Sequence, residues 1–415
     1  MPFIADLHIH SHYSIATSAD MVPEEIWRWA QLKGLTVVAT GDATHPGWLA
    51  ELEEKLEPAG NGLFVLKAAW RRPEEVPDAC RADVFFMLSA EISCVYRKNG
   101  GTRKVHCLVF FPDMAGARRL SNALSKVGSV ASDGRPILKL DAADLLRMVL
   151  DISDDALFVP AHAWTPHYSV FGAVSGFDSL EESFGDLAPY VSAIETGLSS
   201  DPAMNRRVSG LDRLTLISNS DAHSPSRMGR EANVFTAEPS YGAIRQAIAA
   251  GGGGAPATIE FFPEEGKYHY DGHAACGVRF APAETMAHAY RCPVCGRRLT
   301  VGVAHRVELL ADRPADAAPR PGEGFRAVIP LAEILAEVAH TGAASKGVRN
   351  AYMRLLSALG GELTVLLDAP LDDIAAASTP LTAEAIDRVR RGRVHISPGY
   401  DGRYGSIKIF DDDTL

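Results

Sequence analysis

Ala5-Asp6-Leu7-His8-Ile9-His10-Ser11-His12, close to the N-terminus, has the pattern of a β-strand with a histidine at every second position. Side chains at alternate positions of a strand point to the same face, so His8 and His10 can offer ring nitrogens to one metal ion. A short histidine-rich strand is weak support on its own, since such strands also occur at surfaces. The metal interpretation gains strength because ligand-type residues recur after five more strand-like runs.

These five runs are compact and apolar, and each leads into residues that commonly bind metal ions. Residues 35–39, 84–88, 157–160, 191–194 and 214–217 lead to Asp42 and His45, Glu91, His162, Glu195, and Asp221 and His223, respectively. The carboxyl ends of buried strands in a barrel-like α/β enzyme meet at one face, so we expect one shared site. A further run, 105–111, carries His106 early, which indicates a strand that curves or runs the other way.

Length and composition predict a large α/β domain followed by one or two small ones. The 415 residues are 47% hydrophobic and 22% charged, as in soluble globular proteins. A formal charge of -11 argues against a broad basic surface for nucleic acid, although it leaves room for local binding. No apolar run approaches the roughly 18 residues of a membrane span, and no secretory leader is evident, so we expect a cytoplasmic protein without a membrane partner.

Two linker-like tracts divide the chain. Gly251–Gly254 follows a helix-like segment, and Asp312–Pro321 is rich in proline and alanine. We therefore predict a metal-dependent domain over residues 1–250, a zinc-binding module over 251–310 and a mainly helical domain over 323–415. Helical spacing in the last segment comes from two apolar sets, Leu331, Ile334, Leu335 and Val338, then Val348, Tyr352, Leu355 and Leu359.

The zinc prediction rests on paired ligand motifs. His273-Ala274-Ala275-Cys276 and Cys292-Pro293-Val294-Cys295 are separated by fifteen residues, a spacing compatible with a closed tetrahedral zinc site. His269 competes with His273 as the histidine ligand. Such a site would stabilise a segment too short to build its own core.

The histidines and carboxylates of the first domain form a set large enough for two or three ions. Mixed ligands of this kind suit Zn²⁺, Mn²⁺ or Fe²⁺. Multinuclear sites serve phosphoester chemistry, because one ion acidifies a water while its neighbours hold the phosphate.

Six motifs together resemble the polymerase and histidinol phosphatase (PHP) superfamily: Asp6-Leu7-His8-Ile9-His10, Thr40-Gly41-Asp42, Ser89-Ala90-Glu91, His106, Pro160-Ala161-His162 and Ser220-Asp221-Ala222-His223. The resemblance implies a distorted seven-stranded (β/α) barrel with three metal ions. It implies one ion bound by His8, His10, Glu91 and Asp221, a second bound by Glu91, His106 and His162, and a third bound by His223 and the Asp42 position. Many members have Thr-Asp-His where this chain has Thr-Gly-Asp, and His45 is the candidate to compensate.

Further strings narrow the resemblance to the endonuclease Q family: Ala16-Thr17-Ser18-Ala19-Asp20-Met21, His162-Ala163-Trp164-Thr165-Pro166, the segment 194–201 and Gly229-Arg230-Glu231-Ala232-Asn233. That family joins a PHP domain to a zinc module and a helical C-terminal domain. The resemblance spans nearly the whole chain. It implies a metal-dependent endonuclease that repairs DNA by cutting 5′ to deaminated bases (uracil, hypoxanthine, xanthine) or abasic sites.

Within this interpretation, Glu91 and Asp221 are the candidate catalytic carboxylates, because they hold the ions that activate the attacking water. Arg230 is a further catalytic candidate and Arg227 a substrate-binding one, since both could clamp the phosphate. The alternative for the two arginines is a surface pair near Glu231.

Three aromatic residues and one carboxylate are candidates for substrate binding. Trp164, Tyr168 and Phe171 follow His162 and could stack on a base or wedge beside it, or else pack beneath a loop. Glu195 stands where a strand should end, so it could bind metal or substrate, although Thr196-Gly197 also fits an ordinary turn.

The expected cofactors are Zn²⁺ in the module and at the catalytic centre, with Mg²⁺ or Mn²⁺ as alternatives at the latter. The expected partner is DNA containing deaminated bases, and a sliding clamp or another repair protein is a further candidate. Two rival functions stay open: a PHP-type phosphatase for a small phosphomonoester, and a catalytically dead DNA-binding scaffold. The zinc module and helical tail argue against the first, and the near-complete ligand set argues against the second.

Overall fold

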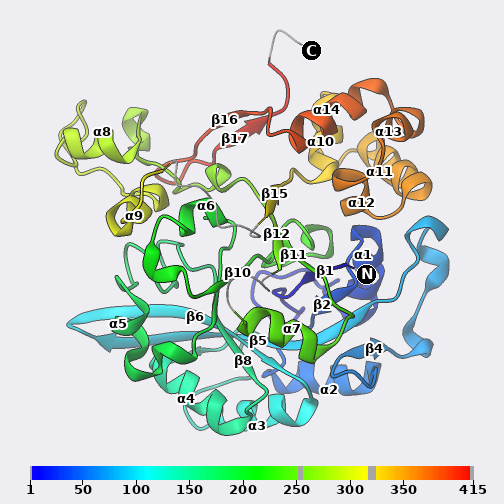
Figure 1. Cartoon of the computed structure of the whole chain (residues 1–415), viewed down its shortest axis with the longest axis horizontal. Coiled ribbons are helices and arrows are strands. Elements are labelled where there is room, and N and C mark those ends of the chain that lie inside the picture. The colour runs from blue at the N-terminus through cyan, green and yellow to red at the C-terminus, as the bar shows by residue number, and fades with distance from the viewer. Residues whose placement is uncertain (1, 251–255, 316–323, 412–415) are drawn as a thin grey trace.

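The computed structural model describes residues 2–250, 256–315 and 324–411. The predicted linker Gly251–Gly254, most of Asp312–Pro321 and the acidic residues Asp412 and Asp413 lie outside this range. Figure 1 shows helices around a central set of strands, with two further helical groups above it. The chain is thus a mixed α/β protein with a central sheet, which agrees with the predicted class.

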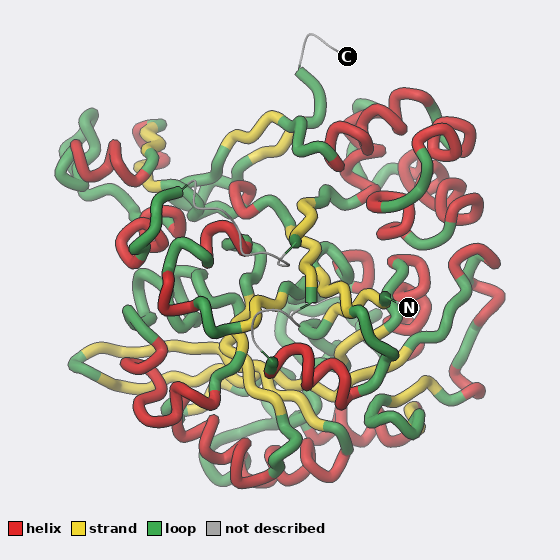
Figure 2. Tube along the Cα trace, viewed as in Figure 1, coloured by secondary structure: helices red, strands yellow, loops and turns green. Residues whose placement is uncertain are grey.

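The central sheet has eleven strands, which Figure 2 shows in yellow at the middle of the molecule. Its main path runs through β15 (Phe325–Ala327), β12 (Ala257–Glu260), β11 (Ala232–Phe235), β1 (Phe3–Asp6), β2 (Val37–Ala39), β5 (Phe85–Lys98), β4 (Phe64–Leu66) and β3 (Leu56–Pro58). From β5 it branches to β7 (Ile137–Leu138) and to β6 (Gly101–Phe111), which pairs with β8 (Leu157–Pro160). The sheet therefore takes strands from all three predicted segments.

The strand that carries His106, β6, is antiparallel to its neighbour β5, which is one of the two arrangements predicted for it. β6 is antiparallel to β5 along its full length, and Ser93 lies opposite His106. The first strand is shorter than predicted, because it ends at Asp6 and the two histidines follow it. Ile9 still forms a parallel bridge with Ala222, so the backbone stays extended there and His8 and His10 remain alternate residues.

Two short parallel strands lie next to the central sheet. β9 (Ala193–Glu195) pairs with β10 (Thr215–Ile217), and the backbone N–H of Ala163 after β8 donates to the Glu195 carbonyl at 2.9 Å. One buried apolar cluster takes side chains from β1, β2, β5, β6, β8, β9, β10 and β11. Tyr241, Ile244 and Ile248 of α7 (Tyr241–Ala249) belong to the same cluster. The ladder itself does not close in the described residues, since β9 and β10 pair only with each other.

Helices pack on the outside of this sheet. α1 (Pro23–Lys33) begins at a proline and ends at Gly34, whose φ of 83° is a left-handed conformation that glycine adopts freely, as predicted. The other outer helices are α2 (Pro46–Lys55), α3 (Met114–Leu124), α4 (Ala142–Ile152), α5 (Leu180–Phe184) and α6 (Pro202–Asn205).

The later part of the chain forms two groups on one side of the sheet (Figure 1). The first comprises β13 (Asp271–His273), β14 (Val278–Phe280), α8 (Pro282–Ala287) and α9 (Val303–Leu310). The second is the helical set α10 (Leu331–Val338), α11 (Lys346–Leu359), α12 (Glu362–Leu367), α13 (Leu371–Ala377) and α14 (Pro380–Arg390). The hairpin β16 (His395–Ser397) and β17 (Ser406–Lys408) lies between them. Both apolar sets predicted at helical spacing lie in helices, α10 and α11.

None of the helices in the described part of the chain combines the length and apolarity that a bilayer-spanning helix needs.

A buried ion pair ties the helical set to the sheet domain. Lys33 Nζ, at the end of α1, lies 2.6 Å from Glu362 Oε2 of α12, and both side chains are about 95% buried. Glu362 also accepts from the Leu331 backbone N–H at 2.9 Å and from the Tyr352 hydroxyl at 2.7 Å. One carboxylate thus connects α12 to α1, α10 and α11, and both of its oxygens accept at least one hydrogen bond.

We predict that Glu362→Ala lowers the free energy of unfolding by about 3–5 kcal/mol, because it leaves the Lys33 ammonium buried without a counter-charge. Urea unfolding followed by circular dichroism measures the loss. Asp368→Ala is the control: its partner Arg326 is more than half exposed, so the change should cost less than about 1 kcal/mol. Equal losses in the two variants would contradict the assignment.

Candidate metal centre

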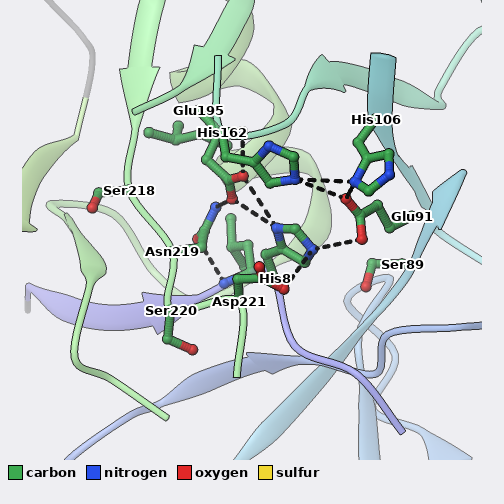
Figure 3. Close-up of polar contacts among 12 residues, drawn as sticks. His8, Ser89, Glu91, His106, His162, Glu195, Ser218, Asn219, Ser220 and Asp221 are labelled. Atoms are coloured by element: carbon green, nitrogen blue, oxygen red, sulfur yellow. Dashed lines mark hydrogen bonds and ion pairs between the residues drawn. The ribbon is translucent and has the colours of Figure 1, made fainter. Parts of the chain in front are cut away.

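Each histidine of the first motif is held by a carboxylate on one ring nitrogen. His8 Nδ1 lies 3.0 and 3.1 Å from the two carboxylate oxygens of Glu195, and His10 Nδ1 lies 3.1 Å from Asp42 Oδ1 (Figure 3 shows the His8 contacts). A carboxylate accepts, so Nδ1 carries the proton of each neutral ring and Nε2 carries a lone pair. Both Nε2 atoms are therefore ready to bind a cation.

The free nitrogens converge on two more carboxylates. His10 Nε2 lies 3.0 Å from Asp221 Oδ1 and 3.2 Å from Glu91 Oε2, and His8 Nε2 lies 3.4 Å from the same Glu91 oxygen. His8 Nε2 is buried and has no hydrogen-bond partner, although most buried polar atoms in proteins have one. A buried ring nitrogen that has no hydrogen-bond partner and faces carboxylate oxygens has the environment of a metal ligand. The ligand atoms of His8, His10, Glu91 and Asp221 all lie within 4.8 Å of one another.

A second group shares Glu91 with the first. Glu91 Oε1 lies 2.6 Å from His106 Nδ1 and 3.1 Å from His162 Nε2, and the two ring nitrogens are 3.2 Å apart. Figure 3 shows both rings directed at this carboxylate. The opposite nitrogen of His162 lies 3.2 Å from the Thr165 hydroxyl, which fixes the ring. The first two predicted ligand sets are thus brought together, with Glu91 between them.

The electrostatics of these buried groups favour a cation. Burial opposes a charge on His8, but the carboxylates of Glu195 and Glu91 outweigh it and raise the pKa of His8 well above its usual value. Burial lowers the pKa of His106 to about 4 against the pull of Glu91, so this ring is neutral at pH 7. Burial would raise the pKa of Glu91, yet His106 and His8 hold it well below its usual range. The field that favours a proton on His8 equally favours a metal ion in its place.

The residues predicted for a third ion are not assembled into one group. Asp42 accepts from His10, from the Ser11 N–H at 2.7 Å and from two serine hydroxyls, so its oxygens are fully used. His45 caps α2 by accepting from the Trp48 N–H, and its Nε2 lies 3.2 Å from the Ala131 carbonyl. His223 lies near the centre, with Nδ1 2.9 Å from the Asp221 carbonyl. Asp42 orients a ligand histidine, and His45 is placed as a helix cap.

Glu195, predicted to bind metal or substrate, orients His8 and also lines the cavity over the centre. Besides that ring it accepts from the His162 backbone N–H and from Asn219 Nδ2, each at 2.8 Å. Asn219 in turn accepts from the Leu7 N–H at 2.8 Å and from Asn233 at 2.9 Å. Sequence reasoning missed Asn219, although its place directly before the Asp221 motif and after a buried strand was a usable signal.

Asp6 and Arg230 both fix the loop that presents Asp221. Asp6 accepts from the Ser220 N–H and hydroxyl at 3.1 and 2.6 Å, and from the Gly229 N–H at 2.9 Å. Arg230 Nε donates to the Ser220 carbonyl at 2.9 Å. Arg230 therefore contacts the loop backbone through Nε, whereas the sequence suggested that it clamps a phosphate.

A cavity of about 470 Å³ opens over the centre, and its wall includes His106, His162, Asp221, Arg135 and Tyr168. Arg135 Nη1 lies 3.3 Å from Glu91 Oε2, which makes it a cation at the edge of the acidic cluster. Sequence reasoning missed Arg135, because it lies in an irregular segment with no motif around it. Tyr168 lines the cavity as expected, with its ring 4.8 Å from that of His106.

The other predicted substrate-binding residues are placed elsewhere. Trp164 is 1% exposed and Phe171 2%, their rings lie 5.0 Å apart, and Trp164 Nε1 donates to Asn205 Oδ1 at 2.7 Å. They pack beneath the loop and do not line the cavity over the centre, which is the second of the two alternatives that the sequence left open. Arg227 pairs with Glu333 of α10 at 3.3 Å and does not line the cavity.

The predicted zinc ligands meet in the module. Ligand atoms of His273, Cys276, Cys292 and Cys295 all lie within 4.8 Å of one another, and Cys295 Sγ is 3.7 Å from His273 Nδ1. His269, the competing histidine, does not belong to this group and is buried elsewhere. The small apolar cluster around them contains only Val278, Cys292 and Leu299 as buried residues, so metal would supply much of the local stability.

Comparison with known proteins identifies the family. The crystal structure of the lesion-specific endonuclease PfuEndoQ from Pyrococcus furiosus is 33% identical, has a TM-score of 0.85, and is matched over 100% of this chain and 98% of that one. The chain belongs to the endonuclease Q family. A structure of endonuclease Q with a 27-mer duplex substrate carrying an abasic lesion at the active site is 33% identical with a TM-score of 0.84, over 100% of this chain and 98% of that one.

Two curated relatives of this endonuclease Q family member are similar in sequence. YqxK of Bacillus subtilis is 33% identical over 309 residues, which are 73% of this chain and 74% of that protein. MJ0043 of Methanocaldococcus jannaschii is 31% identical over 273 residues, 63% of this chain, and the match spans only 34% of its own length. Residues 330–393 match the MJ0043 C-terminal domain family, which here is the helical set α10–α14.

We predict that Glu195→Gln weakens metal binding by about 10- to 100-fold, because the amide no longer fixes the proton and orientation of His8. Metal content after dialysis against graded chelator, read by mass spectrometry, gives the affinity. His12→Ala is the control, since His12 pairs with Glu51 outside both ligand groups. Unchanged affinity in Glu195→Gln would contradict the orienting role.

We predict that Cys276→Ala loses one equivalent of zinc per chain, whereas Cys80→Ala, at a buried cysteine outside the module, keeps it. Metal analysis of the purified proteins measures this. Retention of that equivalent by Cys276→Ala would exclude the proposed tetrahedral site.

Proposed function

We propose that this protein is a metal-dependent DNA endonuclease that cuts the phosphodiester bond 5′ to deaminated bases (uracil, hypoxanthine, xanthine) or abasic sites. The single observation that carries the proposal is the pair of ligand groups that share Glu91 at the base of an open cavity. Family membership supports DNA as the substrate, because a relative was solved with a lesion-bearing duplex at its active site.

The metal ligands in this proposal are the residues that the structure brings together: His8, His10, Glu91 and Asp221 for one ion, and Glu91, His106 and His162 for another. The buried, unpartnered Nε2 of His8 supports this fit. Divalent ions at this place would supply positive charge to phosphate oxygens and lower the pKa of a water. We propose Zn²⁺, Mn²⁺ or Mg²⁺ here and structural Zn²⁺ in the module.

The common apolar cluster supports the further proposal that the strand set is the distorted seven-stranded barrel of PHP proteins. Eight strands contribute to it, and all of them except β11 are strands of the proposed barrel. The candidate ligands His162 and Asp221 follow the carboxyl ends of β8 and β10. This placement matches a site formed at the carboxyl ends of barrel strands.

Side chains of the chain itself would position the substrate. Arg135 would bind a non-bridging phosphate oxygen, since its guanidinium lines the cavity beside Glu91 and keeps donors to spare. Tyr168 would lie against the sugar or base of the lesion, with its ring supported by His106 on one side and by Lys104 Nζ 4.9 Å from its centroid. Glu195 and Asp42 keep the two histidine rings fixed throughout.

The test is incubation of the protein with labelled duplexes that carry one uracil, one hypoxanthine, one abasic site or no lesion, with Mg²⁺, Mn²⁺ or Zn²⁺. We expect a single cut 5′ to the lesion, and a rate at least about 100-fold lower for Asp221→Ala, which loses a predicted ligand. Asp186→Ala, at an exposed carboxylate, is the matched control. No cut under any metal, with phosphate released from small monoesters, would replace this proposal by the phosphatase.

A further inference from the structure

A second cavity, of about 780 Å³, adjoins the one over the metal centre. Thr165, His167, Leu198 and Ser199 line both cavities, so these residues form a shared wall between the two. The rest of the second cavity is lined by Pro166 and Val174, by residues of the segments 263–269 and 300–303, and by Asp401 and Tyr404 in the turn before β17. A substrate longer than one nucleotide would therefore pass from the first cavity into the second.

Backbone hydrogen bonds fix the turn before β17 against the segment 263–269. The Gly402 N–H donates to the Lys267 carbonyl at 2.9 Å, and the Gly405 N–H donates to the Glu265 carbonyl at 3.0 Å. A side chain at Gly405 would place its Cβ 2.2 Å from the Glu264 carbonyl oxygen, so only glycine permits this approach. The turn thus holds Tyr404 in a fixed place relative to Lys267.

Lys267 lies between two tyrosines that line the second cavity. Its Nζ is 5.7 Å from the ring centroid of Tyr268 and 5.8 Å from that of Tyr404. Within the described ranges, no carboxylate forms an ion pair with Lys267. The carboxylate of Asp401 lines the same cavity, where it accepts from the Thr300 hydroxyl and the Ala274 N–H, each at 2.6 Å, and forms no ion pair with Lys267. An ammonium flanked by aromatic rings and lacking an acid is available to an anion.

Tyr404 and His269 add two features that a ligand would satisfy. Tyr404 is 77% exposed, whereas aromatic rings usually bury most of their surface. His269 is 6% exposed at the same cavity, and its Nδ1 has no hydrogen-bond partner. An exposed ring, an unpaired cation and a buried ring with a free nitrogen therefore line one continuous space.

We propose that this second cavity binds the DNA strand beside the lesion, with Lys267 on a backbone phosphate and Tyr404 stacked on the neighbouring base or sugar. The inference rests on the proposed function and assigns a contact beyond the metal centre. Stacking on aromatic rings and pairing with isolated cations are how proteins hold single nucleotides irrespective of sequence. A local site of this kind also suits a chain whose formal net charge is -11.

The experiment compares Tyr404→Ala and Lys267→Ala with wild type, by fluorescence anisotropy at low temperature without added Mg²⁺ or Mn²⁺. The probes are uracil duplexes of full length and duplexes shortened separately on the 5′ or the 3′ side of the lesion. We expect each variant to bind the full duplex about 10-fold more weakly. Lys267→Ala should also reduce the salt dependence of binding by about one phosphate contact.

The length series makes the test specific. Shortening one of the two sides should weaken wild type about 10-fold and leave Tyr404→Ala unaffected, because the strand then no longer reaches the missing ring. Tyr190→Ala and Lys126→Ala are matched controls at an exposed tyrosine and an exposed lysine outside both cavities, and both should bind like wild type.

Binding of the full duplex by Tyr404→Ala and Lys267→Ala at wild-type strength, or equal weakening at every length, would overturn the inference. Cleavage is scored separately, so the two proposals fail in different ways. A wild-type protein that shows the length effect but never cuts would contradict the endonuclease proposal and leave this contact in place.

Discussion

Two carboxylate–histidine hydrogen bonds underlie the site. Glu195 and Asp42 hold the Nδ1 atoms of His8 and His10, which sets the tautomer of both rings and directs both Nε2 atoms at Glu91 and Asp221. The surrounding framework serves these bonds: Asn219 fixes Glu195, and serine hydroxyls fix Asp42. Removing either carboxylate would leave the ring with the contacts of its Nε2 side to Glu91 and Asp221, but its tautomer would no longer be fixed by a carboxylate.

The backbone at the centre is strained, and the packing around it maintains that strain. Asp42, His162 and Asp221 have φ values of 50°, 30° and 47°, a left-handed region that costs residues other than glycine about 1–3 kcal/mol each. Each lies just after a strand, where the chain must turn sharply to direct a side chain into the site. Gly197, with φ of 61°, allows the next loop to pass against His162, because a Cβ there would lie 2.5 Å from the His162 Cβ. The fold thus tolerates an unfavourable backbone conformation at these three residues, and this conformation brings the candidate ligands together.

Much of this arrangement was predictable, and the failures have physical causes. The ligands Glu91, His162 and Asp221 follow apolar runs, and such runs identify buried strands whose ends share a face. The roles of Asp42 and Glu195 were not predictable, since a carboxylate beside a metal site can bind the ion or orient a ligand, and only the hydrogen bonds separate the two. The place of Trp164 stayed open because a loop can fold its aromatic residues inward or present them to a ligand, and Arg135 carried no local pattern at all. The first strand ends at Asp6, and the chain beyond it pairs with Ala222 only through Ile9, a tertiary contact that no local rule contains.

The pairing of β1 with a strand far along the chain determines when this part of the sheet can form during synthesis. β1 pairs with β11, and Phe3 lies opposite Phe235, so the strand that precedes the two histidines lacks one neighbour until that residue has been made. At typical synthesis rates the interval is about 10–50 s. During most of that time the nascent chain exposes an unpaired apolar edge, and Glu195 and Asp221 are made only shortly before Phe235. The residues that surround the two histidines therefore come together only after most of the sheet domain has been synthesised.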